Sequence, residues 1–259
     1  MPSMDDLEGT ASWLERLESL NGVIAATGKP LEGNLFYDVR QKDFVRSAPN
    51  SILKPKRDRF RRAISGRTRL LEVGVNGGHS AYLALTTNPD LEFHGVDICE
   101  HAYVLPAIRW LQSEFPGRVF FYEGDCLKVL PNLAKGGQRF DCFHIDGGKQ
   151  TYFRDILNCH RLATNGAVLA ILDDVQMEAV ARVWSRCLRL GLLAPAEGFP
   201  PMSDEIKYRH AIGVLAPIAA WRLMFLRGWA RRDPLGALTH KVARRMGRLA
   251  HGDMSALRR

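Results

Sequence analysis

Short apolar runs alternate with longer amphipathic stretches between Arg69 and Leu215. Runs that are apolar nearly throughout are typical of parallel strands buried on both faces. Their alternation with helical patterns is typical of a sheet that carries helices on both sides. We therefore predict a doubly wound, mostly parallel α/β domain with strands at 69–75, 91–97, 119–123, 140–146 and 167–172, a candidate late strand at 210–215, and helices at about 79–87, 101–115, 152–162 and 175–190.

The chain on either side of this core has a different pattern. Residues 11–23 have the spacing of an amphipathic helix, and residues 28–55 are rich in turn-forming residues and run into a basic stretch. We therefore divide the chain into an N-terminal cap or lid (residues 1–64), an α/β domain (residues 65–216) and a basic tail (residues 217–259).

The tail carries the excess positive charge. The formal net charge is +8, and ten basic residues against two acidic ones follow residue 216. Large apolar side chains recur three to five residues apart with arginines between them, although Pro234 interrupts the pattern: Trp221, Phe225, Trp229, Leu238, Val242, Met246 and Leu249. A basic amphipathic helix with tryptophans is typical of a peripheral membrane anchor. Packing against the body or a partner subunit, as in a homo-oligomer, and a solvated basic end are the alternatives.

The rest of the composition argues against several classes of protein. A basic tail on a charge-balanced body does not predict a nucleic-acid groove, so we expect no nucleic-acid partner. Five scattered cysteines without a C-x-x-C pair support neither a disulfide framework nor a zinc ribbon. The chain begins with an acidic stretch, and charged residues interrupt the apolar stretch at 211–230. We expect a cytoplasmic protein without a membrane-spanning helix. If the tail is a membrane anchor, the protein is expected to be bound peripherally to a membrane.

Each predicted parallel strand is followed by a glycine loop or by an acidic residue. The residues are Gly74-Val75-Asn76-Gly77-Gly78, Asp97, Asp125, Asp146 and Asp173-Asp174. Ligands of open parallel sheets bind beyond the carboxyl ends of the strands, so these residues predict one site. Taken singly, each carboxylate is more often an ordinary surface group. The alternative interpretation of the glycine loop is a tight structural turn between a strand and a helix.

The glycine loop lacks the spacing of the common phosphate-binding loops. A dinucleotide fingerprint would need glycine where Asn76 and His79 stand, and no Gly-Lys-Ser/Thr follows. The remaining pattern, with Glu72, Gly74 and Gly78, suits a ligand that has a cationic end and no phosphate, such as S-adenosylmethionine. Asp97 lies 23 residues after Gly74, a spacing at which a carboxylate accepts ribose hydroxyls.

Residues 65–190 resemble the class I S-adenosylmethionine-dependent methyltransferases, and within them the small metal-dependent O-methyltransferases of the catechol, caffeoyl-CoA and macrocin types. The resemblance is carried by L-L-E-V-G-V-N-G-G-H-S-A (70–81), H-G-V-D-I (94–98), E-G-D-C (123–126), F-D-C-F-H-I-D-G-G-K-Q-T-Y (140–152) and G-A-V-L-A-I-L-D-D-V (166–175). It implies a seven-stranded Rossmann-like sheet. It also implies a cofactor site made of Glu72, Gly74, Asn76, Gly78, Ser80, Asp97, Ile98, Asp125, Cys126 and Asp146.

The resemblance also implies catalytic residues and a metal. Asp146, Asp173 and Asp174 match the ligands of a divalent cation, for which Mg²⁺ is typical. Lys149 matches the general base of the catechol-type enzymes, and we expect desolvation and the cation to lower its pKa. The chain departs from these families in having Asp173-Asp174 where the catechol type has Asp-Asn. It also has Asp146-Gly147-Gly148-Lys149 where the macrocin type, which modifies sugars, has Asp-Gly-Asp-His.

Several alternatives remain for these residues. Asp173 and Asp174 could instead cap the helix that begins near Val175. His79 is expected to pack near the cofactor, and His144, inside a strand, is expected to be a hydrogen-bonded core residue.

We predict methyl transfer from S-adenosylmethionine to a hydroxyl of a small molecule or glycan, with Lys149 and Asp146 as catalytic residues and a divalent cation assisting. Phe36, Tyr37, Tyr152 and residues 28–50 are expected to shape the acceptor pocket. The alternatives are a metal-independent N- or carboxyl-methyltransferase and a non-catalytic membrane-associated or partner-binding protein with the same fold.

Overall fold

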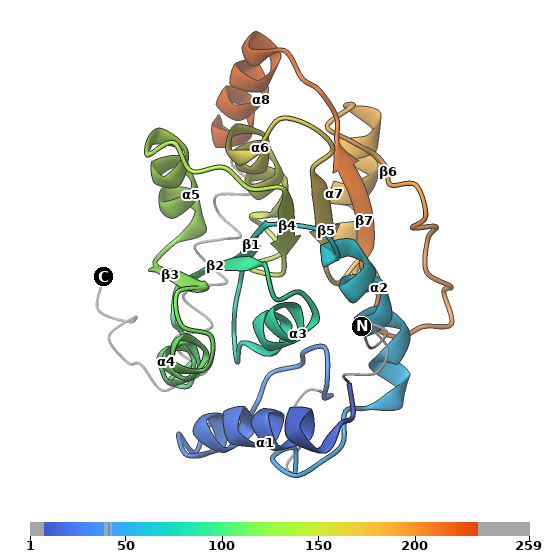
Figure 1. Cartoon of the computed structure of the whole chain (residues 1–259). Coiled ribbons are helices and arrows are strands. Elements are labelled where there is room, and N and C mark those ends of the chain that lie inside the picture. Colours follow the sequence, from blue (N-terminus) through green and yellow to red (C-terminus); the bar gives the residue numbers. More distant parts are fainter. Residues whose placement is uncertain (1–7, 39–40, 42, 233–259) are drawn as a thin grey trace, which may run out of the picture.

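Seven strands form one sheet in the computed structural model, which describes residues 8–38, 41 and 43–232 (Figure 1). The order of the strands across the sheet is β3-β2-β1-β4-β5-β7-β6. Their bounds are β1 (Arg69–Val73), β2 (Glu92–Asp97), β3 (Val119–Glu123), β4 (Cys142–Ile145), β5 (Leu169–Leu172), β6 (Leu193–Pro195) and β7 (Ala211–Leu215). The predicted doubly wound, seven-stranded fold is therefore confirmed, and every parallel strand except β3 has narrower bounds than predicted.

Strands β1 to β5 are parallel, and β7 is antiparallel to both of its neighbours. The chain order reverses at β1, because β1 pairs with β2 on one side and with β4 on the other. The helices that follow β1 and β4 therefore lie on opposite faces of the sheet, and ligands of such folds bind at the crevice that this leaves at the carboxyl edge.

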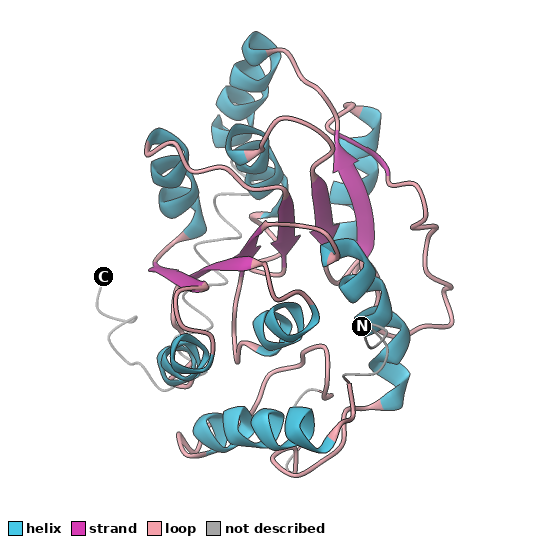
Figure 2. Cartoon of the chain, viewed as in Figure 1, coloured by secondary structure: helices cyan, strands magenta, loops and turns pink. Residues whose placement is uncertain are grey.

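Helices cover both faces of the sheet (Figures 1 and 2). Their bounds are α1 (Ala11–Ala25), α2 (Lys54–Ile64), α3 (His79–Thr87), α4 (Val104–Glu114), α5 (Cys126–Lys135), α6 (Tyr152–Leu162), α7 (Glu178–Arg189) and α8 (Ala220–Arg232), with a 3₁₀ turn at Ser51–Leu53. Successive strand residues point to opposite faces. Leu70 of β1 accordingly packs with α1 to α4, and Leu71 packs with α5 to α8. The two faces thus have separate hydrophobic cores.

Three of these elements, α2, α5 and β6, were not predicted from the sequence. Helix α5 has an apolar stripe, in which Leu130 is buried and Val129 and Leu133 are partly buried, but it contains Pro131, which argues against a helix when only the sequence is read. Strand β6 is three residues long, ends in Pro195 and lies at the edge of the sheet, where proline is tolerated because no neighbour needs its N–H.

The N-terminal segment packs on the sheet rather than on a core of its own. Helix α1, predicted at residues 11–23, buries Trp13, Leu17 and Ile24 in the core that contains Leu70 of β1. The basic stretch after it forms α2, and its Arg57 is buried. The Arg57 guanidinium donates to a carboxylate oxygen of Glu8 at 2.8 Å and to two backbone carbonyls.

Helix α8 begins the predicted basic tail. The regular spacing of apolar residues was predicted to continue to Leu249, but residues 233–259 lie outside the described part of the chain. Among the described residues, no helix is long and apolar enough to cross a membrane.

A buried amide joins α1 to the turn-rich segment and to α3. The Asn21 Nδ2 donates to Tyr37 Oη at 2.9 Å and to the Phe44 carbonyl at 3.1 Å, and the Asn21 Oδ1 lies 2.9 Å from His79 Nε2. His79, expected near the cofactor, is thus bonded to α1. Burial lowers its pKa to about 3, so its ring is neutral and donates to the amide oxygen.

We predict that Asn21→Leu lowers the free energy of unfolding by about 1–3 kcal/mol, because it leaves buried polar groups of the partner residues without a bond. The midpoint of urea unfolding measures this loss. Asn132→Leu, at an exposed position of α5, is the matched control and should change the stability by less than about 0.5 kcal/mol. Equal stability of the two variants would contradict the role assigned to Asn21.

Candidate active site

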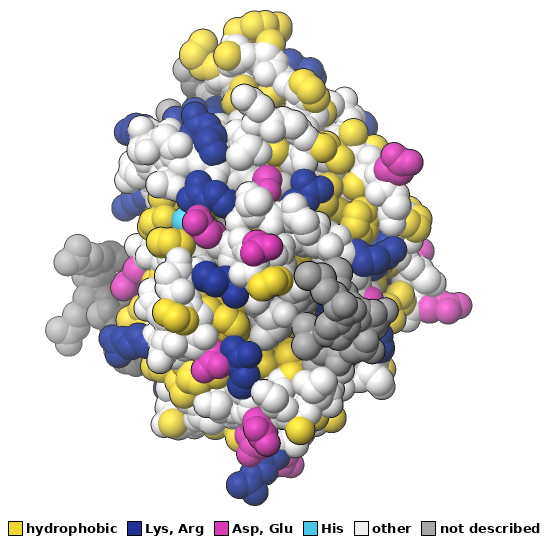
Figure 3. Space-filling view, in the orientation of Figure 1, with side chains coloured by type: hydrophobic (Ala, Val, Ile, Leu, Met, Phe, Trp, Pro, Cys, Tyr) yellow, Lys and Arg dark blue, Asp and Glu magenta, His cyan; other side chains and the backbone are white. Residues whose placement is uncertain are grey.

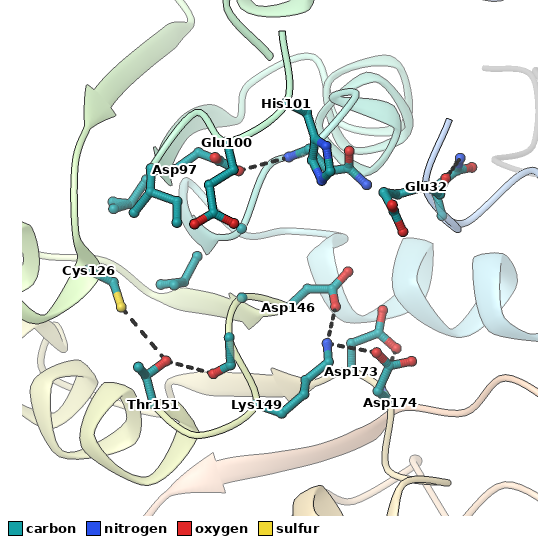
Figure 4. Close-up of a pocket in the computed structure, with 18 of the residues that line it drawn as sticks. Glu32, Asp97, Glu100, His101, Cys126, Asp146, Lys149, Thr151, Asp173 and Asp174 are labelled. Carbon is teal, nitrogen blue, oxygen red and sulfur yellow. Dashed lines mark hydrogen bonds and ion pairs between the residues drawn. The ribbon is translucent and has the colours of Figure 1, made fainter. Parts of the chain in front are cut away.

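A pocket of about 480 Å³ opens at the carboxyl edge of the sheet (Figure 4). It is lined by the loops after β1, β2, β3, β4 and β5 and by parts of the N-terminal segment. Ten predicted site residues lie on its wall: Gly74, Asn76, Asp97, Ile98, Asp125, Cys126, Asp146, Lys149, Asp173 and Asp174. Three others, Glu72, Gly78 and Ser80, do not line it; Glu72 and Ser80 are buried behind it.

Glycine is required in the first loop for two reasons. Gly74 has φ +86°, and a Cβ there would lie 2.6 Å from the Asp146 carbonyl oxygen, so only glycine lets the loops after β1 and β4 touch. Gly78 has φ +74° and precedes α3, and a Cβ there would lie 2.7 Å from a methyl carbon of Leu111. The backbone at Gly74 therefore lines the pocket, whereas Gly78 lies away from the pocket and lets Leu111 pack against the start of α3.

Asp97, at the end of β2, fixes this loop. Its Oδ2 accepts hydrogen bonds from the backbone N–H of Val75 at 2.8 Å and of Asn76 at 3.0 Å, and its Oδ1 accepts from Cys99 N at 2.7 Å. Charge-assisted bonds of this kind are the stronger ones. The carboxylate is therefore held in one orientation on the pocket wall, beside the exposed side chain of Ile98.

The loop after β3 brings Asp125 and Cys126 to the same wall. Asp125 is the N-cap of α5 and accepts from Leu127 N at 2.9 Å. The Cys126 thiol lies 3.8 Å from the Thr151 hydroxyl, and burial together with nearby Asp155 raises the pKa of the thiol. Cys126 therefore stays neutral and contributes a polarisable surface to the pocket.

Lys149 lies between two of the predicted metal ligands. Its Nζ is 3.0 Å from Asp146 Oδ1 and 2.7 Å from Asp174 Oδ2 (Figure 4). It also donates to Tyr152 Oη at 3.0 Å. Burial alone would lower the pKa of Lys149, but the adjacent carboxylates outweigh burial and raise it. The predicted lowering of this pKa is therefore not found: in this arrangement Lys149 is a cation.

Asp173, the third predicted ligand, pairs with a lysine that was not predicted as a site residue. Lys56 Nζ, from α2, lies 2.6 Å from Asp173 Oδ1, and both side chains are about 95% buried. The same carboxylate accepts from Asp174 N at 2.7 Å and lies 3.6 Å from His144 Nε2. The capping alternative for the two aspartates is wrong, because α7 begins at Glu178 after Met177, which makes no side-chain capping bond.

His144 links Asp173 to Glu72. Its Nδ1 lies 2.5 Å from Glu72 Oε1. Burial would lower the pKa of His144, but the two carboxylates raise it to about 10, so the ring is an imidazolium. Glu72 was predicted to belong to the cofactor site, and in the structure it is part of a buried chain of alternating charge, Glu72–His144–Asp173–Lys56. The ligand atoms of His144, Asp146 and Asp173 lie within 4.8 Å of one another, and a metal ion bound there would have to displace the proton of the His144 ring.

The N-terminal segment closes the remaining side of the pocket. Of the residues predicted to shape the acceptor pocket, Tyr37 lines it, whereas Phe36 and Tyr152 are buried outside its wall. Glu32 and Asn34, from the predicted stretch 28–50, also line it, and so does His101, which was not predicted (Figure 4 labels Glu32 and His101). His101 precedes α4 in a loop, and no pattern in the sequence marks it as a site residue.

Burial also tunes Asp146. Desolvation and the neighbouring Asp173 carboxylate raise its pKa to about 6, although Lys149 opposes this effect. The wall that holds Asp146, Asp173, Asp174, Lys56 and Lys149 is thus densely charged.

Comparison with known proteins agrees with this geometry. Residues 71–175 match the family described as "Methyltransferase domain". No curated protein matches the chain.

Solved structures share its fold. An O-methyltransferase from Bacillus cereus in complex with SAH has a TM-score of 0.61 at 16% identity, over 82% of this chain and 94% of that one. TomG, an O-methyltransferase from Streptomyces achromogenes in complex with SAM, has a TM-score of 0.56 at 15% identity, over 84% of this chain and 100% of that one. Residues 71–175 are therefore similar to a methyltransferase domain, and the chain has the fold of these two solved O-methyltransferases.

Proposed function

We propose that the chain transfers a methyl group from S-adenosylmethionine to a hydroxyl of a small molecule or glycan. One observation carries the proposal: a single pocket joins the glycine loop and Asp97 on one side to Asp146, Asp174 and Lys149 on the other. A methyl donor and its acceptor can therefore lie in one cavity. The SAH and SAM complexes of the two structurally similar O-methyltransferases support the choice of cofactor.

The cofactor would lie along the loops after β1, β2 and β3. The Asp97 carboxylate, held by backbone N–H groups, would accept the ribose hydroxyls, and Asp125 and Cys126 would border the adenine. Ile98 offers one of the few exposed large apolar side chains among the described residues and would cover a face of the base. The backbone from Gly74 to Asn76 would approach the methionine part.

The acceptor would enter between the Lys149 region and the N-terminal segment. Methyl transfer forms a bond from the acceptor oxygen to the methyl carbon and breaks the bond from this carbon to sulfur, and the hydroxyl proton leaves to a base. Such an in-line displacement depends mainly on alignment. Polar side chains of Glu32, Asn34 and Tyr37 on this wall suit an acceptor with several hydroxyl groups.

The donor set fits a divalent cation at Asp146, Asp173 and Asp174. Carboxylate oxygens are the ligands that Mg²⁺ prefers, and the Lys149 ammonium already places a positive charge within 3.0 Å of two of them. A bound cation would lower the pKa of the acceptor hydroxyl and replace Lys149 as the partner of these carboxylates, which would leave the Lys149 amine available as the base. Asp173 would keep its buried pair with Lys56.

We predict that S-adenosylhomocysteine binds the purified chain and that Asp97→Ala weakens binding about 10- to 100-fold, because charged hydrogen bonds contribute about 1.5–3 kcal/mol. Isothermal titration measures the affinity, and circular dichroism checks the fold. Asp90→Asn, an exposed carboxylate outside the pocket, is the control. No binding to the folded wild type would contradict the proposal and favour a non-catalytic protein with this fold.

We predict that Mn²⁺, used in place of Mg²⁺, binds one site in the presence of S-adenosylhomocysteine, and that Asp146→Ala weakens this binding more than about tenfold. Loss of the electron paramagnetic resonance signal of free Mn²⁺ measures binding. Asp174→Asn is the matched variant: position 174 has φ +58°, which asparagine adopts readily, and its amide keeps one ligand oxygen. A wild type that binds S-adenosylhomocysteine but no Mn²⁺ would favour metal-independent transfer.

A further inference from the structure

Helix α8 has two opposite apolar faces. Leu226 and Ala230 are buried and, with Leu223, pack on the core formed with α5, α6 and α7. Trp221, Met224 and Phe225, on the other side, are about 70% exposed. These three recur at the i, i+3, i+4 spacing of one helix face. We call them, with the half-exposed Trp229, the α8 apolar face.

This face is unusual for a globular protein. Isolated exposed apolar residues are common, but a contiguous group marks a surface that binds a partner. The described residues include eight large hydrophobic side chains that are markedly exposed, and four of them are in this one helix. In Figure 3, hydrophobic atoms gather at the top of the molecule, over α8.

Positive charge borders the α8 apolar face. The Arg186 guanidinium lies 4.1 Å from the Trp229 ring centroid and 4.2 Å from that of Phe153. Arg154 and Arg227 line a small hollow between α5, α6 and α8. Helix α8 itself contains four arginines and no acidic residue.

We infer that α8 docks the protein on an anionic membrane surface. Trp221, Met224 and Phe225 would enter the interface between headgroups and acyl chains, and Arg186, beside Trp229, would lie near the lipid phosphates. Tryptophan favours this depth because its ring is amphipathic. Each basic residue near an anionic leaflet adds attraction, which is screened by salt.

The positive charge of α8 favours an anionic membrane over two other partners, a second copy of the chain and residues 233–259. A symmetric contact with a second copy would bring the same arginine-rich helix against itself, which like charges oppose. Residues 233–259 contain six basic residues against two acidic ones, so they repel this surface as well. A membrane rich in anionic lipid has the opposite sign and an apolar interior.

Docking through α8 leaves the pocket open. Leu215, at the end of β7, lies beside the start of β5 because the two strands are antiparallel, and α8 follows from this amino edge of the sheet. The pocket lies at the carboxyl edge. We therefore expect membrane binding and S-adenosylhomocysteine binding to be independent.

The test is sedimentation of the full chain with vesicles of phosphatidylcholine alone or mixed with phosphatidylglycerol. We expect binding to the anionic vesicles, weakened by added salt, and at least about tenfold weaker binding to neutral ones. The triple variant Trp221→Ser, Met224→Ser, Phe225→Ser should lose this binding and keep its affinity for S-adenosylhomocysteine. The control Ile52→Ser, Met177→Ser removes exposed apolar side chains outside α8 and should bind vesicles as the wild type does.

Three results would overturn the inference. The wild type could fail to bind anionic vesicles, or the triple variant could bind them as well as the wild type. Light scattering could also show a wild-type dimer that the triple variant converts to a monomer, which would assign the α8 apolar face to a second copy of the chain.

Discussion

The buried ion pair between Lys56 and Asp173 determines how the N-terminal segment meets the sheet. Moving two charges out of water is costly, and their attraction offsets this cost only when further hydrogen bonds satisfy them. Here the Asp174 N–H donates a hydrogen bond to the Asp173 carboxylate, and the His144 imidazolium lies beside the same carboxylate. Glu72 pairs with the other nitrogen of the His144 ring. Removing one partner of such a pair typically costs about 3–5 kcal/mol. Helix α2 is therefore fixed to the end of β5, and the loops before it are fixed beside the pocket.

The buried chain Glu72–His144–Asp173–Lys56 connects the proposed cofactor side of the pocket to the proposed acceptor side. Glu72 belongs to β1, whose loop approaches the proposed cofactor, whereas Lys56 and Asp173 line the proposed acceptor side. The Gly74 backbone and the Asp146 carbonyl are also in contact, which only glycine allows. A change on the acceptor side therefore alters the support of the cofactor side, so the relative placement of donor and acceptor depends on both halves together.

The sequence was sufficient to predict the sheet and most of the pocket wall, because both depend on local pattern. Buried parallel strands are apolar runs, and their carboxyl ends meet at one edge, so the residues after them were predicted to lie together. Lys56 could not be assigned to the site, since its partner Asp173 is 117 positions away and a basic stretch usually forms a solvated face. Glu72 matched a family motif, but its bond to His144 depends on the pairing of β1 with β4.

The error on Lys149 has a more specific physical origin. The expected lowering of its pKa considered desolvation and a cation, and it omitted the two carboxylates that contact the ammonium. These carboxylates hold the proton on Lys149. A divalent cation at the proposed site would therefore have to compete with an ammonium group that is covalently part of the chain. Its apparent affinity would be reduced by the free energy of breaking the ion pairs of Lys149 with Asp146 and Asp174. The same competition would couple the two proposed roles, because these carboxylates would release Lys149 as a base when another positive charge replaced it.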